Sequence, residues 1–105
     1  MEVKFEKQYL EDLYVKGKTD DKKYRFQPAV VNGYLKCVKA LVNVSKMEDL
    51  YTFHSLNYEK LKGDLQGFSS LRINDKYRLL FREIANKETT SVELCSLTDI
   101  TNHYK

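Results

Sequence analysis

The sequence predicts an α+β fold in which N-terminal helices pack on one face of a small antiparallel sheet. Apolar residues recur at helical spacing from residue 8 to residue 50, whereas residues 68–97 hold alternating, strand-like runs. Two of these runs, 68–73 and 77–84, flank a polar break at residues 74–76. Its Asn and Asp tolerate the left-handed backbone of tight turns. Helices followed by an antiparallel meander are typical of this fold class.

Length and composition indicate one ordinary domain. A chain of 105 residues is long enough for a single modest core, so we expect residues 1–105 to fold as one unit. No stretch approaches the roughly 18 apolar residues of a membrane span. The charged start, MEVKFEK, is unlike a signal peptide, so we expect a cytoplasmic protein that does not bind membranes. The net charge of +3 allows a polyanionic partner only where basic residues cluster.

The N-terminal part predicts a short strand and two helices. Residues 2–5 alternate polar and apolar, which suits an edge strand. A helix begins near Gln8 and stops at Gly17, and a longer one begins at Pro28, a residue suited to a first helical turn. Each helix carries one apolar stripe that we expect to be buried. The first stripe comprises Leu10, Leu13 and Tyr14, and the second comprises Val31, Tyr34, Leu35, Val38, Leu41 and Val42.

The segment between the second helix and the hairpin predicts little regular structure. Ser45 and Glu48 have the spacing of a capping box, so we expect a short helical turn through Leu50. Residues 51–60 have no clean period and are interpreted as a loop. Its apolar side chains, expected to pack inward, are Tyr51, Phe53 and Leu56.

The two faces of the predicted hairpin differ in character. Alternation places Leu71 on one face and Arg72 on the other. A three-residue connection at 74–76 sets Arg72 opposite Arg78, whereas a two-residue connection shifts the pairing by one. Two paired arginines repel each other unless an anion lies between them. The apolar face, expected to pack against the helices, comprises Leu71, Ile73, Leu79 and Phe81.

The C-terminal part predicts one more strand and a last helical turn. Residues 91–97 alternate, with Val92 and Leu94 expected to face inward. Thr98 or Asp99 can cap a helical turn over residues 100–104.

No metal, cofactor or phosphate-loop motif is apparent. His54 and His103 lie far apart, and His103 has only Asp99 at helical spacing, whereas a metal site needs three or four ligands. Gly63 and Gly67 do not have the spacing of a dinucleotide-binding loop. The two cysteines, at positions 37 and 95, form no CxxC pair and are expected to be reduced core residues. We therefore expect neither a metal nor a cofactor.

A set of basic residues is the strongest candidate for a function. Charge patterning alone also fits a solvated sheet edge. However, Lys62, Arg72 and Arg78 can all reach the sheet face that the helices leave open, where clustered cations would position phosphate. A metal-free ribonuclease needs a base for the ribose 2′-hydroxyl, cations for the pentavalent phosphate and an acid for the leaving oxygen. The basic set is Lys60, Lys62, Arg72, Arg78 and Arg82, with His103 and Tyr104 near the C-terminus.

Two stretches resemble a known family. Residues 61–81, LKGDLQGFSSLRINDKYRLLF, strongly resemble the central hairpin of the RelE/ParE toxin superfamily, especially its HigB-like branch. Residues 91–105, SVELCSLTDITNHYK, resemble its last strand and catalytic tail. The resemblance implies a microbial-RNase-like, RelE-type fold and a bacterial toxin that cleaves messenger RNA in the ribosomal A site. It also implies a cognate antitoxin, in this branch usually a helix-turn-helix protein that binds DNA.

The resemblance also implies catalytic residues. Lys62, Arg72 and Arg78 match the family's basic residues, which would contact phosphate, and His103 matches a histidine that is a candidate general acid or base. Relatives of the HigB branch often have a histidine three positions before the lysine, where this chain has Glu59. Glu59 is therefore a second candidate base.

Further residues and two rival functions complete these expectations. Lys60 and Arg82 are expected to bind RNA, and Tyr104 to stack on a base or orient it. One rival function is a non-enzymatic, ParE-like inhibitor of DNA gyrase. The other is a degenerate member that binds only its antitoxin and DNA.

Overall fold

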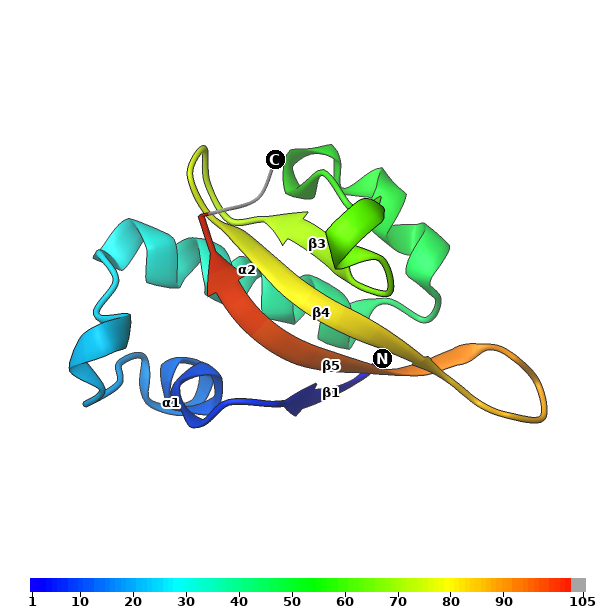
Figure 1. Ribbon diagram of the computed structural model, residues 1–105, viewed down its shortest axis with the longest axis horizontal. Coiled ribbons are helices and arrows are strands. Elements are labelled where there is room, and N and C mark those ends of the chain that lie inside the picture. The colour runs from blue at the N-terminus through cyan, green and yellow to red at the C-terminus, as the bar shows by residue number, and fades with distance from the viewer. Residues whose placement is uncertain (103–105) are drawn as a thin grey trace.

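In the described part of the chain, five strands form one sheet, and two α-helices lie against it (Figure 1). The structure is a computed structural model, and it describes residues 1–102. The helices precede the antiparallel meander, which confirms the predicted α+β fold class. The helices and strands are β1 (Glu2–Phe5), α1 (Gln8–Lys16), α2 (Pro28–Asn43), β2 (Glu59–Lys60), β3 (Ser69–Arg72), β4 (Arg78–Ala85) and β5 (Val92–Thr101). Short 3₁₀ turns are η1 (Lys22–Tyr24), η2 (Met47–Thr52), η3 (His54–Leu56) and η4 (Gly63–Leu65).

The sheet has the strand order β1-β5-β4-β3-β2. Strands β2 to β5 pair antiparallel, as expected for a meander. The N-terminal strand differs, because β1 lies parallel to β5, with Glu2 opposite Leu94 and Phe5 opposite Leu97. The first and the last strands of the described chain are therefore neighbours, as Figure 1 shows.

Helix α1 has the predicted bounds but a slightly different buried face. Gly17 ends it in the left-handed conformation at φ 78°, and its N–H donates to the oxygen of Leu13 at 3.0 Å. Tyr9 and Leu13 are buried, whereas Tyr14 is 40% exposed. The expected burial of Tyr14 is therefore wrong, because the helix turns Tyr9 toward the core instead.

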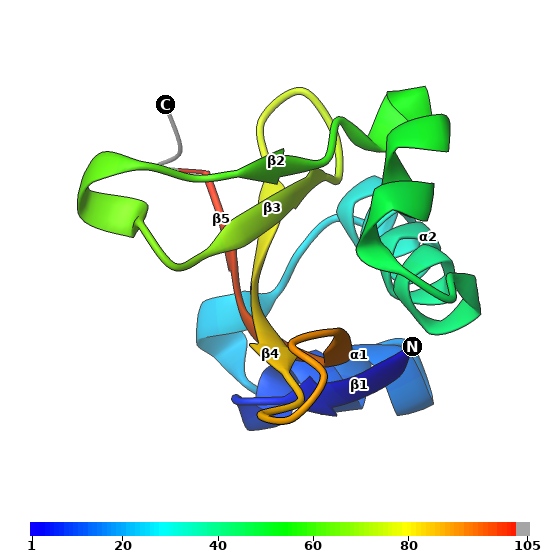
Figure 2. The ribbon, with the colours of Figure 1, turned by 90° about the vertical axis from the view of Figure 1, so that its right-hand side faces the viewer.

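Helix α2 carries the main stripe of the core. Tyr34, Val38 and Leu41 are fully buried, as predicted. Val42 is exposed, against expectation, whereas Cys37 is fully buried beside the stripe. The helix lies on one side of β3 and β4 (Figure 2). The buried residues of the sheet that form one cluster with it are Leu71, Leu79, Phe81, Cys95, Leu97 and Ile100. The helices therefore cover the predicted apolar face, and the Arg72 side of the sheet faces away from them.

A close approach to the hairpin fixes the position of α2. A Cβ atom at Gly33 would lie 2.6 Å from the backbone oxygen of Ile73, so only glycine fits here without a shift. One turn further along, the Cys37 thiol donates to the backbone oxygen of Arg72 at 3.5 Å. The helix therefore contacts the backbone of β3 directly where that strand ends.

The segment between α2 and β3 corrects two expectations. Ser45 does not cap η2, because Lys46 occupies the N-cap position and no side chain caps the turn. Tyr51 and Phe53 are exposed, and only Leu56 of the expected apolar set is buried. Residues 51–60 are not a single loop, since η3 and the short strand β2 lie within them.

The C-terminal strand also differs from expectation. The expected helical turn from residue 100 is wrong over the described residues, because Ile100 and Thr101 pair with β4. Val92 packs against the core as predicted, but Leu94 lies on the opposite face. An irregularity in the pairing between Ile84 and Ala85 explains this, since it reverses the alternation between positions 92 and 94.

Both cysteines lie in the core, as expected. Cys37 and Cys95 are free thiols and fully buried. Burial raises the pKa of each thiol to about 12. Neither is a thiolate at neutral pH, so neither has the character of a nucleophile.

Candidate functional site

Arg72 lies directly opposite Arg78 at the turn end of the β3–β4 hairpin. The backbone N–H of Ile73 donates to the oxygen of Tyr77 at 3.0 Å, so three residues form the connection. The side-chain oxygen of Asn74 accepts the N–H of Tyr77 at 2.8 Å and shapes the turn. This turn sets the register, and of the two connections considered, the three-residue one, which pairs the two arginines, is the one observed.

The arginine face is the sheet surface that carries Arg72, Arg78 and Glu59. Glu59 is paired with Ser70, which shares a face with Arg72 because the two are separated by two positions on β3. On the other side, Thr101 of β5 is paired with Arg78. The fold therefore brings a carboxylate and two guanidinium groups, far apart in sequence, to one surface.

The guanidinium of Arg72 has an anionic partner within its own turn. It forms an ion pair with Asp75, and their side chains are 40% and 89% exposed. Ion pairs this exposed contribute little to stability. Because the pair is so weak, a phosphate can replace the Asp75 carboxylate at low cost.

Ser70 lies on the arginine face, and the sequence analysis did not single it out. Its side chain is fully buried between Glu59 and Leu80 in the register, and its Oγ has no hydrogen-bond partner among the described residues. A buried hydroxyl without a partner is uncommon, since its desolvation is left uncompensated. No signal in the sequence marks Ser70, because two serines in a strand are common. Its burial follows from the pairing of β3 with both β2 and β4, which the sequence alone does not show.

Arg82 lies further along β4 on the same face and has structural partners. Its guanidinium carbon is 4.6 Å from the centre of the Phe68 ring, and its Nε is 3.4 Å from Oε2 of Glu6. The Ser96 hydroxyl donates to the same carboxylate oxygen at 2.8 Å. Arg82 is thus tied to the N-terminal segment, away from the hairpin turn.

The structure separates Lys60 from the arginines. Lys60 pairs with Ser69, so its side chain lies on the other side of the sheet from Glu59. Lys62 follows β2 as the N-cap residue of η4, a turn on the side of the sheet away from α2 (Figure 2). Lys60 therefore does not share the arginine face, and its expected role in RNA binding stays a prediction.

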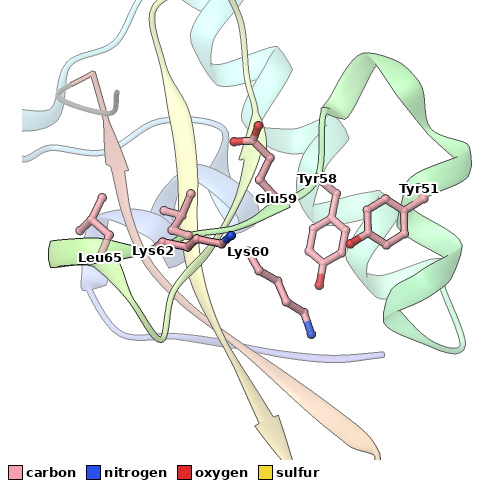
Figure 3. Close-up of a pocket in the computed structure, with 7 residues that line it drawn as sticks. Tyr51, Tyr58, Glu59, Lys60, Lys62 and Leu65 are labelled. Atoms are coloured by element: carbon pink, nitrogen blue, oxygen red, sulfur yellow. The ribbon is translucent and has the colours of Figure 1, made fainter.

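An open cavity of about 510 Å³ lies at the outer edge of β2. Figure 3 shows this β2-edge pocket, with Lys60 and Tyr58 extending to one side of the strand and Glu59 to the other. The residues that line it are Tyr51, Tyr58, Glu59, Lys60, Leu61, Lys62 and Leu65.

Two of the expected site residues cannot be placed. His103 and Tyr104 lie outside the described residues. Within residues 1–102 no group of three or more His, Cys, Asp or Glu side chains could hold a metal ion. In that same part of the chain, no helix is both long and apolar enough to cross a membrane.

Comparison with known proteins identifies the family. Residues 3–94 match the family model of the HigB-like toxin, a RelE-like toxin of the type II toxin–antitoxin system HigB. This chain is a HigB-like toxin. The toxin is 31% identical over 83 residues to Toxin HigB-1 of Vibrio cholerae serotype O1, a match that covers 78% of this chain and 83% of that protein. The predicted RelE/ParE membership and HigB-like branch are confirmed, and a type II toxin has an antitoxin as its partner.

Solved structures confirm the fold of this HigB-like toxin. The YoeB/ParE toxin from Agrobacterium tumefaciens matches with a TM-score of 0.55 and 18% identity, over 99% of this chain and 100% of that one. The YoeB-YefM complex from Staphylococcus aureus matches with a TM-score of 0.56 and 21% identity, over 99% of this chain and 98% of the matched chain. At such identities the likeness shows the RelE-type fold alone.

Proposed function

We propose that this HigB-like toxin is a ribosome-dependent endoribonuclease that works without a metal. In this proposal a ribose 2′-hydroxyl of messenger RNA loses its proton to a base and attacks the adjacent phosphodiester. The bond from phosphorus to the 5′-oxygen of the next nucleotide breaks as an acid protonates that oxygen. The observation that supports it is the pairing of Arg72 with Arg78 on the face that also carries Glu59. Two cations and a carboxylate on one open surface supply charge stabilisation and a proton acceptor, the main requirements of this reaction.

The arginines bind and stabilise the phosphate. A guanidinium matches a phosphate with two parallel hydrogen bonds, and two guanidiniums side by side favour a dianionic transition state over the singly charged diester. Arg72 exchanges its exposed partner Asp75 for the phosphate when RNA binds. Lys62, which follows the edge strand, contacts a phosphate at the periphery of the site.

Glu59 and His103 are the groups that move protons. His103 is two positions after Thr101, the residue paired with Arg78, and its unperturbed pKa of about 6.5 suits proton transfer near neutral pH. Glu59, on β2 at the opposite side of the arginine face from β5, is the alternative base. Tyr104 stacks on the scissile nucleotide or orients it. Arg82 adds positive charge along the path of the RNA.

The cognate antitoxin neutralises the toxin by covering or distorting the arginine face, or by blocking access to the ribosome. In this branch it is a helix-turn-helix protein encoded beside the toxin, and binding is in the nanomolar range typical of tight, specific interfaces. Co-purification after co-expression of the two genes tests this pairing. The toxin acts in the cytoplasm, where ribosomes and messenger RNA are found.

A primer-extension map of cellular messenger RNA after brief induction tests the function. Cuts in frame with codons are expected from the parental chain and not from the Arg72→Ala variant. Intact messenger RNA with broken DNA would identify a ParE-like gyrase inhibitor instead. Intact messenger RNA and DNA would identify a member that only binds its antitoxin.

A further inference from the structure

We propose that the β2-edge pocket is a second nucleotide subsite, which binds an unpaired base and its phosphate beside the scissile bond. The inference rests on the proposed ribonuclease function and extends it to the flanking RNA. The pocket of about 510 Å³ lies in the range of about 300–1,000 Å³ typical of small-molecule sites. Neither Arg72 nor Arg78 lines it, and of the three residues that define the arginine face it shares Glu59 alone.

The pocket has a rigid aromatic floor. Tyr58 is buried, and its hydroxyl donates to Oε2 of Glu83, which also accepts the Ser69 hydroxyl at 2.5 Å. Its ring lies nearly parallel to that of Phe81, with centroids 6.3 Å apart. These contacts hold the Tyr58 ring on two sides in the free protein. Binding a ligand therefore costs no further conformational entropy for this ring.

Tyr51 forms an open aromatic wall beside this floor. Its side chain is 55% exposed, and its ring centroid lies 4.9 Å from that of Tyr58 at an angle of 60°. Figure 3 shows the two rings side by side at one end of the pocket. An exposed tyrosine ring in a cavity is a stacking platform for a base, and any base can use it.

The charge of the pocket selects a polyanion. Lys60 and Lys62 line it, and the single carboxylate among the lining residues belongs to Glu59. That carboxylate points to the other side of β2, as Figure 3 shows. A base on Tyr51 therefore has its phosphate near two ammonium groups, the combination that binds single-stranded nucleic acid.

The pocket continues the arginine face around the edge of the sheet. Glu59 and Lys60 are neighbours in sequence on opposite faces of β2, and β2 is the last strand of the sheet. A strand of RNA that passes over this edge contacts Glu59 and then Lys60 within a short distance. The subsite thus receives a nucleotide close to the one being cleaved.

A binding experiment tests the subsite directly. The probe is a short single-stranded RNA that carries 2-aminopurine and 2′-O-methyl groups, which block cleavage. Stacking on Tyr51 quenches the 2-aminopurine fluorescence. We expect Tyr51→Ala and Lys60→Gln each to weaken binding of the probe about tenfold. Tyr51→Ala should also remove the quenching. Tyr51→Phe, which keeps the ring, should bind the probe as the parental chain does.

Matched controls show whether the effect belongs to the pocket. Phe53 is an exposed aromatic residue near Tyr51 that does not line the cavity, and Lys39 is an exposed lysine on α2. Phe53→Ala and Lys39→Gln should bind the probe as the parental chain does. Circular dichroism confirms that every variant is folded. Parental binding by folded Tyr51→Ala would overturn the proposal, and so would equal losses in the controls.

Cleavage on programmed ribosomes separates this proposal from the proposed function. For the subsite variants we expect a raised KM or an altered preference for the flanking nucleotide, with kcat within about twofold of the parental value. A parental chain that binds the probe through Tyr51 but cleaves nothing would refute the function and keep the subsite. If the parental chain cleaves but Tyr51→Ala changes neither KM nor probe binding, the proposed function stands and the subsite is refuted. Should Tyr51→Ala weaken only the antitoxin complex, the pocket is a protein contact and the proposal is wrong.

Discussion

The hydroxyl oxygen of Tyr9 accepts a hydrogen bond from the backbone N–H of Ile100 at 2.8 Å and donates to the Asp99 carboxylate. The ammonium of Lys7 lies 3.1 Å from the other oxygen of that carboxylate. Helix α1 is thereby joined to the end of β5, next to the residue paired with Arg78. The last described strand of the sheet is thus held in place by one buried side chain from the start of the chain.

Replacing Tyr9 by Phe should destabilise the protein by about 1–3 kcal/mol. The substitution removes two hydrogen bonds, each worth about 0.5–1.5 kcal/mol. The Ile100 N–H keeps Oδ1 of Asp99 at 3.0 Å and the Asp99 carboxylate keeps Lys7, so neither group is left without a partner. Urea unfolding measures the change. Tyr14→Phe, at an exposed position of the same helix, is the control and should be neutral. Equal stability of the Tyr9→Phe and parental chains would show that water replaces the hydroxyl.

Gly33→Ala should also destabilise the protein, although alanine is the better helix former. Alanine in a helix interior stabilises the helix relative to glycine by up to about 1 kcal/mol. Against this gain, the added Cβ would lie 2.6 Å from the Ile73 oxygen, and the shift this forces on the hairpin costs about 1–3 kcal/mol. Thermal unfolding should show a lower Tm for Gly33→Ala and no loss for Asn32→Ala at an exposed neighbouring position. A higher Tm for Gly33→Ala would refute the close contact.

Arg72→Ala and Arg78→Ala should each slow single-turnover cleavage on programmed ribosomes by about 10²–10³-fold, the typical cost of removing one preorganised charge contact. Antitoxin binding and stability should change little. Arg25→Ala removes an exposed arginine outside the arginine face and should cleave at the parental rate. A parental rate from either of the first two variants would exclude that arginine from catalysis.

His103→Gln should slow cleavage by about 10²–10⁴-fold if this histidine transfers a proton. Glu59→Gln, measured in the same assay, tests the carboxylate that shares the arginine face. A parental rate for His103→Gln beside an inactive Glu59→Gln would make Glu59 the base. If both variants keep the parental rate while both arginine variants lose it, catalysis is electrostatic and positional.

The free energy of unfolding should fall as the pH rises from about 9 to about 12. Burial raises the pKa of Cys37 and Cys95 from an ordinary 9.0 to about 12, so the folded chain keeps protons that the unfolded chain releases in this interval. Below pH 9 both states are protonated and these thiols add no pH dependence. The slope is at most about 1.4 kcal/mol per pH unit for each thiol.

Urea unfolding at about pH 8 and about pH 9.5 measures this dependence while most tyrosines are still protonated. A variant with both cysteines replaced by alanine is the control, and its stability should change less between the two pH values. An equal slope in the parental and control chains would assign the loss to other groups.

Local signals explain what the sequence could predict. The Asn74 turn sets the hairpin register through hydrogen bonds within a few residues, so the sequence could predict the hairpin and limit it to two registers, one of which pairs Arg72 with Arg78. Gly17 and Pro28 mark helix bounds by their own backbone preferences, and both were predicted correctly.

Distant contacts explain the failures. Tyr9 is buried in place of Tyr14 because Asp99 and Ile100, about ninety positions away, bind its hydroxyl. Residues 100–101 are strand because β4 offers them partners, which overrides a weak capping signal. The face that Lys60 occupies could not be predicted, because β2 has two residues, too few for a visible alternation.

The parallel pairing of β1 with β5 has a consequence for the timing of activity during synthesis. Strand β5 lies between β4 and β1, so until β5 is made, β1 lacks the strand it pairs with and β4 has β3 on one side alone. A nascent chain whose β5 is still inside the ribosomal tunnel therefore has its β3–β4 hairpin but lacks Thr101 opposite Arg78. We expect the toxin to become competent only after β5 has left the tunnel, which leaves an interval in which an antitoxin can reach an incomplete sheet. Cleavage by stalled nascent chains in which β5 remains inside the tunnel would refute this order of events.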